Sequence, residues 1–439
     1  MDATTTTAPD DGGAPARPAA RTRTAVLVAA FDSQLKWVGR VQEALEARGI
    51  ACRTIVPSDV RHAISPAQQA EYAHSSAVLE EAPWDEVVAA SLDADVVALA
   101  LSGPFVERFT QDLVSRGGDR LPVVVCGWVG VIIEKLVAGY LDRAAADVIA
   151  VNSGEDLERF RRTAAALGLD DSNLLLSGLP LLGSAAAPRR TTGAPRTVLF
   201  ADQPTVPERR AERLYVYDRL VRYAVRHPDR QVRLKPRHRP GEDTFHRMAH
   251  HPERLLAGRD LPPNFHVDYT PISAQLDEVD LLLTVSSTAA LESVGAGVTT
   301  ALVSDLGVRE QLGNQVFVSS GLLRTFDDLE ADDLPEPDRA WLDGYFFGEP
   351  GTTPAERVAR RVEELLEHPE RRVLPSVASS SYFAARSAYL TATAALAGAP
   401  GARRGPGRWR AVRALKTRAY RWAPGTAQRA EDALARVLR

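Results

Sequence analysis

Three short segments of the 439-residue chain group side chains that could bind an anionic substrate or take up a proton. The first follows an apolar run and contains Asp32, Ser33 and Lys36. A carboxylate after a strand can act as a general base, with the Lys36 ammonium one helical turn further on. Asp32 and Ser33 would equally serve as caps of the next helix, so both interpretations stay open. The segment has no GxGxxG pattern, so neither NAD nor FAD binding is predicted.

The second segment is a basic loop after another apolar run: Lys235-Pro236-Arg237-His238-Arg239-Pro240. The prolines stiffen it, and its cationic donors suit an anionic ligand. A solvated basic loop without a ligand is the alternative. The nearby histidines have no carboxylates at ligand spacing, so no metal site is predicted, and we expect them to be surface helix residues: His246, His250 and His251.

The third segment carries three consecutive hydroxyl residues, Ser286, Ser287 and Thr288, after an apolar run, with Glu292 four residues on. Hydroxyls and free backbone N–H groups at a helix start bind phosphate, and Glu292 would lie one turn inside, where it could accept bonds from a ribose. The alternative is a plain serine N-cap, but one serine would suffice for that.

The elements that must position these segments alternate between strands and helices. Strands are predicted at 24–31, 51–56, 95–101, 122–126, 147–151, 174–176, 197–200, 231–234, 264–267, 280–285, 299–303 and 315–318, with helices such as 35–48, 131–141, 354–367 and 380–397. Continuous apolar strands between helices indicate parallel sheets covered on both faces. A Pro/Gly/Ala-rich break at 180–195 separates two such series. The predicted fold class is therefore α/β, with two Rossmann-like domains that face a cleft.

These patterns give the domain organisation. We expect a disordered leader (1–22), an N-terminal Rossmann-like domain (23–185), a C-terminal Rossmann-like domain (195–350), closing helices (351–400) and a basic tail (401–439). The chain has two cysteines, Cys52 and Cys126, far apart, which excludes a disulfide scaffold and indicates a reducing compartment. It has no apolar stretch long enough for a transmembrane helix and no secretory signal pattern, so a cytoplasmic location is expected.

The net charge of −4 is unevenly distributed, because residues 403–439 carry eleven Lys/Arg against two acids and the rest of the chain therefore carries −13. Residues 408–422 of the basic stretch 403–422 can form a basic amphipathic helix with Trp409 and Trp422. Such a helix suits an anionic membrane surface, which predicts a peripheral location at the inner face of the plasma membrane. Packing of the tail on the acidic body, or disorder, is the alternative.

The order of the three segments resembles that of GT-B glycosyltransferases, which have two Rossmann-like domains and use nucleotide-activated donors. Within that class, the basic loop and the Ser-Ser motif are similar to those of bacterial sialyl- and polysialyltransferases, Kdo transferases and CDP-glycerol glycerophosphotransferases. The segment at Asp32 also resembles a family of glycosyltransferases found mainly in actinobacteria. The resemblance covers residues 24–320 and implies transfer of a sugar to a cell-surface glycan or a lipid-linked acceptor.

The resemblance also makes residues 23–185 the acceptor domain and residues 195–350 the nucleotide-donor domain, and it implies roles for individual residues. The donor phosphate would be held by Ser286, Ser287 and Thr288 together with Lys235, Arg237 and His238; Glu292 would bind the ribose. Tyr269, Thr270, Pro271 and Ile272 would cover the base. Where glycerophosphotransferases carry His-Gly-Thr-Pro, this chain has Cys126-Gly127-Trp128-Val129. Asp32 and His238 are therefore the candidate catalytic residues, with Ser33, Lys36, Gly127 and Trp128 on the acceptor side.

Two other functions compete with sugar transfer. A nucleotide-sugar 2-epimerase has the same two-domain fold and could use the same phosphate pocket. A non-catalytic protein that binds nucleic acid through the tail is the second, since Trp409, Tyr420 and Trp422 lie among basic residues. It leaves the three segments without a role, so no nucleic-acid partner is expected. The predicted donor is a nucleotide sugar, with a CMP-linked sugar favoured by family analogy, and no cofactor or metal ion is required.

Overall fold

The computed structural model describes residues 21–388, apart from 60–78, 119, 134–135, 184, 189–192, 241, 243–247, 350, 382 and 387. The chain divides into two compact units, Met1–Ser376 and Val377–Arg439, and the first contains all strands of the described residues. The predicted leader, except for residues 21 and 22, lies outside the described residues. So do the predicted tail and most of the predicted helix at 380–397.

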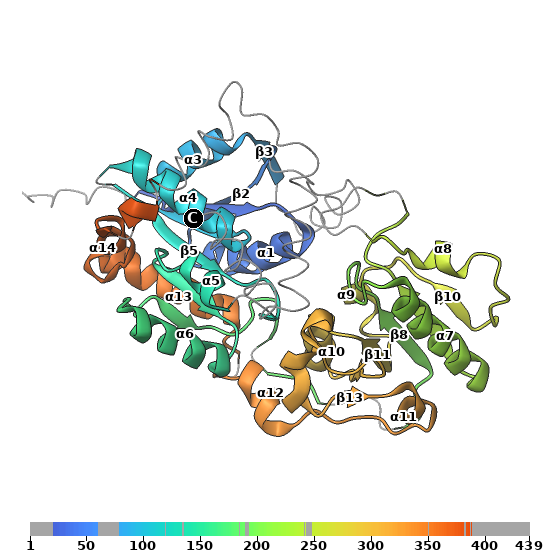
Figure 1. The fold of residues 1–439 in the computed structure, drawn as a ribbon. Coiled ribbons are helices and arrows are strands. Elements are labelled where there is room, and N and C mark those ends of the chain that lie inside the picture. The colour runs from blue at the N-terminus through green and yellow to red at the C-terminus, as the bar shows by residue number, and fades with distance from the viewer. Residues whose placement is uncertain are drawn as a thin grey trace, which may run out of the picture. The chain divides into compact units, whose positions relative to one another are not determined.

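The first half of the chain forms a seven-stranded parallel sheet with the strand order β3-β2-β1-β4-β5-β6-β7 (Figure 1). Its strands are β1 (Thr24–Ala29), β2 (Ala51–Pro57), β3 (Leu79–Ala82), β4 (Val96–Ala100), β5 (Val123–Gly127), β6 (Val148–Val151) and β7 (Leu174–Leu176). The helices between them are α1 (Asp32–Glu46), α3 (Trp84–Leu92), α4 (Gly103–Gly117), α5 (Leu136–Leu141) and α6 (Gly154–Leu167). The order reverses between β1 and β4, as in dinucleotide-binding folds.

Alternation along β1 shows why both faces of this sheet are covered. Ala25, Leu27 and Ala29 belong to one hydrophobic cluster, which includes buried side chains of α1 and of α13 (Pro354–Glu367). Val26 and Val28 belong to the opposite cluster, with side chains of α3, α4 and α6. Side chains of a strand point alternately to the two faces, so a strand without polar residues must be covered on both.

The second half repeats this architecture with six parallel strands in the order β10-β9-β8-β11-β12-β13. The strands are β8 (Thr197–Ala201), β9 (Gln231–Lys235), β10 (Phe265–Val267), β11 (Leu281–Thr284), β12 (Thr299–Val303) and β13 (Leu323–Arg324). The helices are α7 (Arg210–Arg226), α8 (Pro252–Leu256), α9 (Ile272–Gln275), α10 (Ala289–Gly295), α11 (Phe326–Glu330) and α12 (Arg339–Tyr345). The reversal of strand order falls between β8 and β11. The prediction of two Rossmann-like α/β domains is confirmed.

Two predicted elements need correction, and one strand was not predicted. Residues 315–318 are not a strand but part of the 3-10 helix η2 (Asn314–Ser320), which lies between Gly313 and Gly321, both with positive φ. The predicted helix at 131–141 is helical only over α5, and residues 131–133 are not helical. The edge strand β3 was not predicted, because its sequence LEEA lacks the β-branched run of the other strands.

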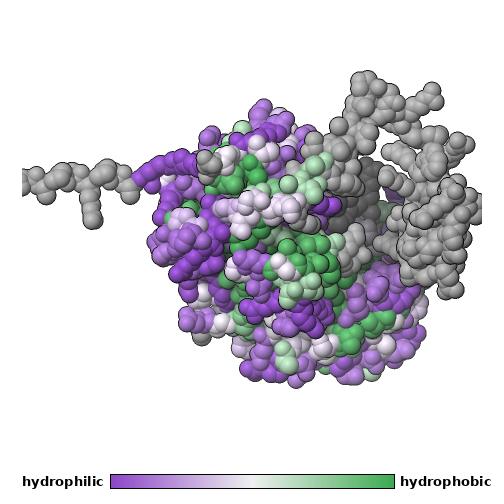
Figure 2. Space-filling view, turned by 60° about the vertical axis from the view of Figure 1, so that its left-hand side comes forward, coloured by the Kyte–Doolittle hydropathy of each residue, from purple (hydrophilic) through white to green (hydrophobic). Residues whose placement is uncertain are grey.

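The surface of the described residues is mainly polar. Figure 2 shows one face, on which hydrophobic residues form separate patches between hydrophilic ones. The exposed large hydrophobic residues are also scattered along the sequence: Val137, Leu167, Tyr215, Val225, Val308 and Val318. Across the described ranges, none of the helices has both the length and the apolar character needed to span a bilayer.

Candidate active site

The three segments singled out in the sequence lie at the carboxyl ends of parallel strands. Asp32 follows β1, Lys235 is the last residue of β9, and Ser286 follows β11. In open parallel sheets the carboxyl ends share one edge, and ligands bind there where the strand order reverses. β1 in the first sheet and β11 in the second each border that reversal, so both sheets carry a candidate segment at the expected place.

Arg237 of the basic loop (residues 235–240) donates a hydrogen bond to Asp32, with 2.5 Å between its Nη2 and the carboxylate Oδ1. Burial acts to raise the pKa of Asp32, but the charge and hydrogen bond of Arg237, with smaller contributions from Ser33 and Lys36, lower it below its ordinary value. The predicted base and the predicted phosphate loop are therefore in direct contact, and Asp32 stays ionised well into the acidic range.

Asp32 is not the N-cap of α1. Phe31 occupies that position and makes no side-chain capping hydrogen bond, although the Asp32 carboxylate accepts the backbone N–H of Ser33 in the first turn. Asp32 is the first helical residue, and its side chain is 23% exposed. Ser33 is half-buried and Lys36 is exposed on the first turn of the same helix. The carboxylate is thus partly open to solvent while it is held by a cation from the second sheet.

His238 of the basic loop is buried, at 7% exposure. Its Nδ1 lies 3.0 Å from the backbone oxygen of Arg239, which assigns the proton to Nδ1 and leaves Nε2 as an acceptor in the neutral ring. Nε2 is buried and has no hydrogen-bond partner among the described residues. Lys235 is half-buried, and its ammonium donates to the oxygen of Pro236 at 3.1 Å.

The prediction that His251 is a surface helix residue is wrong. It is 3% exposed and occupies the N-cap of α8, where its Nδ1 accepts a hydrogen bond from the Glu253 backbone N–H at 3.3 Å. Its Nε2 lies 3.0 Å from the backbone oxygen of His238 and donates to it. His251 therefore fixes the backbone of the basic loop. His250 is half-buried outside the regular helices, and His246 lies outside the described residues.

Tyr269, in the loop predicted to cover the base, is already packed against neighbours. Arg239 lies over its ring at 4.4 Å, the His251 ring stacks at 6.3 Å, and its hydroxyl donates to Glu253 at 2.5 Å. Burial and the Glu253 carboxylate raise the pKa of Tyr269.

The other residues of this loop are also held. The backbone N–H of Thr270 donates to the Asp268 carboxylate, and its backbone oxygen accepts from the Gln275 amide. Pro271 is the N-cap of α9 and Ile272 its first residue. This loop is therefore rigidly held beside the basic loop.

The three hydroxyls of the hydroxyl loop (residues 286–288) are used differently. Ser286 is buried and donates its hydroxyl to the backbone oxygen of Leu312 at 2.5 Å. Ser287 is half-buried, and its Oγ accepts the Ala289 N–H at 3.2 Å. Thr288 is the N-cap of α10 but makes no side-chain capping bond. Ser286 is thus committed to the fold, which leaves Ser287 and Thr288 as the hydroxyls best placed for a ligand.

Thr288 also contacts the segment after β5 in the first sheet. Its Oγ1 accepts a hydrogen bond from the Val131 N–H at 3.4 Å, and Gln315 donates to the oxygen of Ile133 at 3.2 Å. A Cβ placed on Gly130 would lie 2.7 Å from Thr288 Oγ1, so a larger residue there would force the Thr288 hydroxyl to move. Glu292 is half-buried on α10, one turn beyond Thr288.

Gly127 and Trp128, assigned to the acceptor side, have evident packing roles. A Cβ on Gly127 would lie 2.9 Å from the Ala150 backbone oxygen, so the close approach of β6 requires glycine. The Trp128 ring stacks on Phe160 at 4.7 Å, and the buried Arg143 guanidinium lies 4.4 Å from its centroid. These two residues shape the carboxyl edge of the first sheet.

One group of residues at the site was missed in the sequence. Asp202 and Gln203 directly follow β8, at the reversal point of the second sheet, and Gln203 contacts Ser286 through its side chain. The same rule that identified the other segments, polar residues after an apolar strand, would have found them. Arg213, which holds both residues, lies on α7 and carries no such signal.

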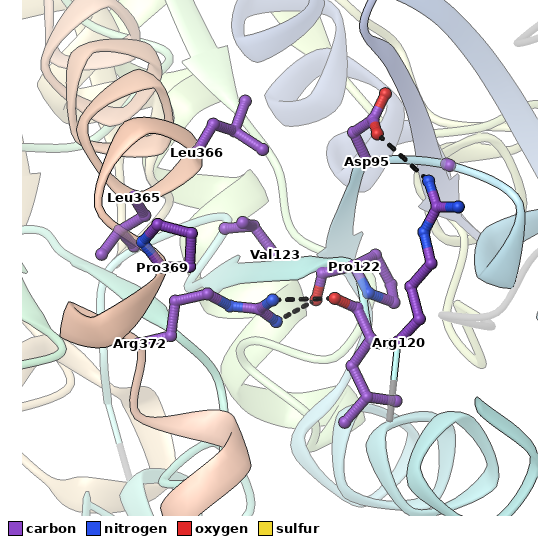
Figure 3. A pocket seen from close by; sticks show the side chains of 10 residues that line it. Asp95, Arg120, Pro122, Val123, Leu365, Leu366, Pro369 and Arg372 are labelled. Carbon is purple, nitrogen blue, oxygen red and sulfur yellow. Dashed lines mark hydrogen bonds and ion pairs between the residues drawn. The ribbon is translucent and has the colours of Figure 1, made fainter. Parts of the chain in front are cut away.

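A small pocket of about 120 Å³ lies at the opposite, amino edge of the first sheet (Figure 3). Arg372 donates there to the backbone oxygens of Leu121 and Pro122, and Arg120 lies 3.8 Å from Asp95. Its charges are thus engaged by the protein, and its lining contains none of the candidate site residues. Within the part of the chain that the structure describes, no group of three or more His, Cys, Asp or Glu side chains is arranged to hold a metal ion.

Comparison with solved structures supports the fold. The chain is similar to a "putative UDP-N-acetylglucosamine 2-epimerase" from Listeria monocytogenes, with 12% identity and a TM-score of 0.52 over 80% of this chain and 96% of that one. It is also similar to the lipopolysaccharide outer core galactosyltransferase WaaB (12%, TM-score 0.45, 78% and 99%) and to the spinosyn forosaminyltransferase SpnP (16%, TM-score 0.42, 81% and 100%). At these identities the likeness concerns the fold alone.

Comparison with curated proteins finds no match. Comparison with family models extends the resemblance seen in the sequence from residues 24–320 to a longer stretch. The family described as "Putative glycosyltransferase (DUF6716)" matches residues 25–365, and the chain belongs to that family of glycosyltransferases.

Proposed function

We propose that this glycosyltransferase moves a sugar from a nucleotide-activated donor to a cell-surface glycan or a lipid-linked acceptor. The observation that carries the proposal is the hydrogen bond between Arg237 and Asp32, which joins a cationic loop to a carboxylate. Sugar transfer needs both: cations that stabilise the departing phosphate and, in an inverting reaction, a base that deprotonates the acceptor hydroxyl. Sites for an anion and for proton removal thus lie next to each other.

In the proposed reaction the donor phosphate displaces Asp32 from Arg237. The freed carboxylate takes the proton of the acceptor hydroxyl, while the oxygen of that hydroxyl bonds to the sugar C1. The bond between C1 and the phosphate oxygen breaks, and the nucleotide leaves with that electron pair. Lys235 and Arg237 stabilise the leaving group in place of a divalent ion, and His238 donates to it through Nε2 when that nitrogen carries a proton. Ser287 and Thr288 donate to the same phosphate, and Glu292 accepts from the ribose.

Nucleotide binding to paired variants tests the phosphate site. Calorimetric titration with CMP, CDP, UDP and GDP should identify one nucleotide that binds, with a cytidine nucleotide expected, and that also raises the thermal stability. Arg237→Met should weaken its binding by about 1–3 kcal/mol. The control is Arg254→Met, because Arg254 is exposed on the neighbouring helix α8. Equal affinity in the two variants would refute the phosphate site.

A nucleotide-sugar 2-epimerase is a second candidate. The fold match to the Listeria epimerase, with a TM-score of 0.52, supports keeping it, although a fold can serve either reaction. Product analysis separates the two: a transferase releases the nucleotide and glycosylates an added acceptor, whereas an epimerase inverts C2 of the sugar while the nucleotide sugar stays intact. An epimerised product formed without acceptor would overturn sugar transfer.

We also propose that the basic stretch 403–422 brings the enzyme to the inner face of the plasma membrane, where a lipid-linked acceptor would be found. Each basic residue near an anionic surface contributes about 1 kcal/mol, which suffices for reversible binding. Flotation with phosphatidylglycerol vesicles should capture the full chain at low salt but not at high salt, and not after truncation at Gly401. Failure of the full chain to float at low salt would refute this location.

A further inference from the structure

We infer that Gln203 is a positioning residue for the donor phosphate, an inference that rests on the proposed function. The side chain of Gln203 sets the backbone of the hydroxyl loop. The buried ion pair of Asp202 and Arg213 in turn sets Gln203. None of these three residues belongs to the segments that suggested the site.

The contact between Gln203 and Ser286 uses both ends of the glutamine amide. The Ser286 backbone N–H donates to Oε1 of Gln203 at 3.0 Å, and Nε2 of Gln203 donates to the Ser286 Oγ at 3.3 Å. The same hydroxyl donates onward to Leu312. Ser286 is therefore held on its backbone and on its side chain, and its orientation leaves little freedom to the two residues that follow.

Gln203 is itself held by a buried network. The side chains of Arg213 and Asp202 are 1% and 0% exposed, and Nη1 of Arg213 donates to both Asp202 oxygens, at 2.8 and 3.0 Å. Tyr217 adds a hydrogen bond to the carboxylate at 2.5 Å. The Asp202 carboxylate also accepts the Gln203 N–H at 2.9 Å. The backbone of Gln203, whose side chain contacts Ser286, is therefore anchored to the buried pair.

The remaining nitrogens of Arg213 bind the backbone of the same turn. Nη2 donates to the oxygens of Gln203 and Pro204, and Nε donates to the oxygen of Pro207. One buried guanidinium thereby binds three backbone oxygens of the turn after β8 and, at the same time, the Asp202 carboxylate. Breaking a buried pair of this kind is costly, so the turn has one stable arrangement.

The location of the contact explains why such rigidity would matter. Gln203 follows β8 and Ser286 follows β11, the adjacent strands between which the strand order of the second sheet reverses. Ligands of open α/β sheets bind at this point. A phosphate binds most tightly when its donors are fixed before it arrives, because ordering them during binding costs free energy. Gln203 acts through Ser286, which distinguishes it from the residues proposed to touch the phosphate.

Two substitutions of Gln203 with a matched control test the inference. Gln203→Met keeps the length of the side chain but removes both hydrogen bonds, whereas Gln203→Glu keeps an acceptor for the Ser286 N–H and adds a negative charge. Gln231→Met is the control, because Gln231 is exposed at the start of β9. The readouts are hydrogen exchange at the Ser286 amide, the nucleotide Kd, and the donor KM and kcat.

We expect Gln203→Met to speed exchange at Ser286 and to raise Kd and donor KM about tenfold, equivalent to one lost hydrogen bond, with kcat little changed. Gln203→Glu should keep slow exchange yet still bind the anion weakly, and high salt should restore part of that affinity. The control should match the wild type in every readout.

Three outcomes would overturn the inference: unchanged exchange at Ser286 in Gln203→Met, faster exchange with unchanged Kd and KM, or a fall in kcat alone. If the wild type binds none of CMP, CDP, UDP and GDP, the proposed function and the positioning role both fail. The exchange at Ser286 would then still show whether Gln203 holds the loop. If Gln203→Met does not fold, Gln203→Glu tests the inference instead. Exchange at Ser286 at the wild-type rate, together with weaker and salt-sensitive nucleotide binding, would support it.

Discussion

Arg237 and Asp32, 205 positions apart in the sequence, form an ion pair that joins the basic loop of the second sheet to the first helix of the first sheet. A guanidinium paired with a carboxylate is not free for a phosphate, and a carboxylate with a lowered pKa is a weak base. Both groups gain their proposed functions when an anion takes the place of Asp32. In the proposed reaction, the pair would thus couple donor binding to activation of the base.

Asp32→Asn should abolish transfer but keep nucleotide binding. The amide cannot take up a proton, and loss of a general base costs about 10²–10⁴-fold in rate. Arg237 loses its anionic competitor, so nucleotide affinity should be equal to or higher than that of the wild type. Steady-state kinetics and calorimetry measure the two effects. Asp93→Asn is the control, since Asp93 is exposed at the end of α3. Full activity of Asp32→Asn would exclude Asp32 as the base.

Arg237→Met should change the pH dependence of the enzyme. Arg237 lowers the pKa of Asp32, so its removal raises that pKa, and the carboxylate becomes protonated at a higher pH. Activity that needs the ionised form is then lost earlier as the pH falls. The acid limb of the profile of kcat/KM against pH should move to higher pH, although all values of kcat/KM will be lower. An acid limb at the same pH in both enzymes would show that the ionisation of Asp32 does not control the reaction.

The two serines of the hydroxyl loop should respond differently to alanine. Ser286→Ala leaves the buried Leu312 oxygen without its donor, so we expect a loss of about 1–3 kcal/mol in unfolding free energy. Ser287→Ala removes a half-buried hydroxyl and should mainly weaken nucleotide binding. Urea unfolding and calorimetry of both variants measure the contrast. The assignment of Ser287 to the phosphate fails if its variant binds as tightly as the wild type.

His238 and His251 should be distinguishable as ligand and support. His238→Ala removes the buried Nε2 and should weaken nucleotide binding by about 1–3 kcal/mol with little change in loop structure. His251→Ala removes the bond to the His238 backbone oxygen and the N-cap of α8, so thermal stability should fall as well. His250→Ala is the control for a half-buried histidine. Wild-type stability of His251→Ala would contradict its supporting role.

Both cysteines should be unreactive in the folded protein. Burial raises the pKa of Cys126 to about 12, and burial together with Glu46 raises that of Cys52 to about 12. Thiolate is the reactive form, so at pH 8 each thiol is almost entirely protonated. A thiol reagent should modify the buried Cys126 only as fast as the protein unfolds and the partly buried Cys52 slowly, and denaturant should release two reactive groups. Rapid labelling of a folded sample would contradict these pKa values.

Much of the fold could be predicted from the sequence, because the central strands are runs of Val, Leu, Ile and Ala buried on both faces. β1, β4, β5 and β12 were found for this reason. The edges were harder, since an edge strand such as β3 needs no apolar run and β13 has only two residues. Residues 315–318 have strand-like composition, but the flanking glycines turn them into a 3-10 helix.

The candidate site was predicted as separate segments, and their mutual contacts could not be. The rule that ligands bind after strands located Asp32, Lys235 and Ser286. No local pattern indicates that Arg237 would donate to a residue 205 positions away, or that the His251 ring would donate to the His238 backbone oxygen. Such contacts depend on tertiary packing.

One hydrophobic cluster is built by both halves of the chain. It includes Trp37 and Leu45 of α1, Leu291 of α10, Leu302 of β12 and Trp341 of α12. A hybrid enzyme could be made by joining one half of this chain to the other half of a related protein. In this protein the seam of such a hybrid would run through a packed core, where even one methylene of mismatch is felt. Exchange of specificities will need residues of this cluster to be transplanted together with the half that is exchanged.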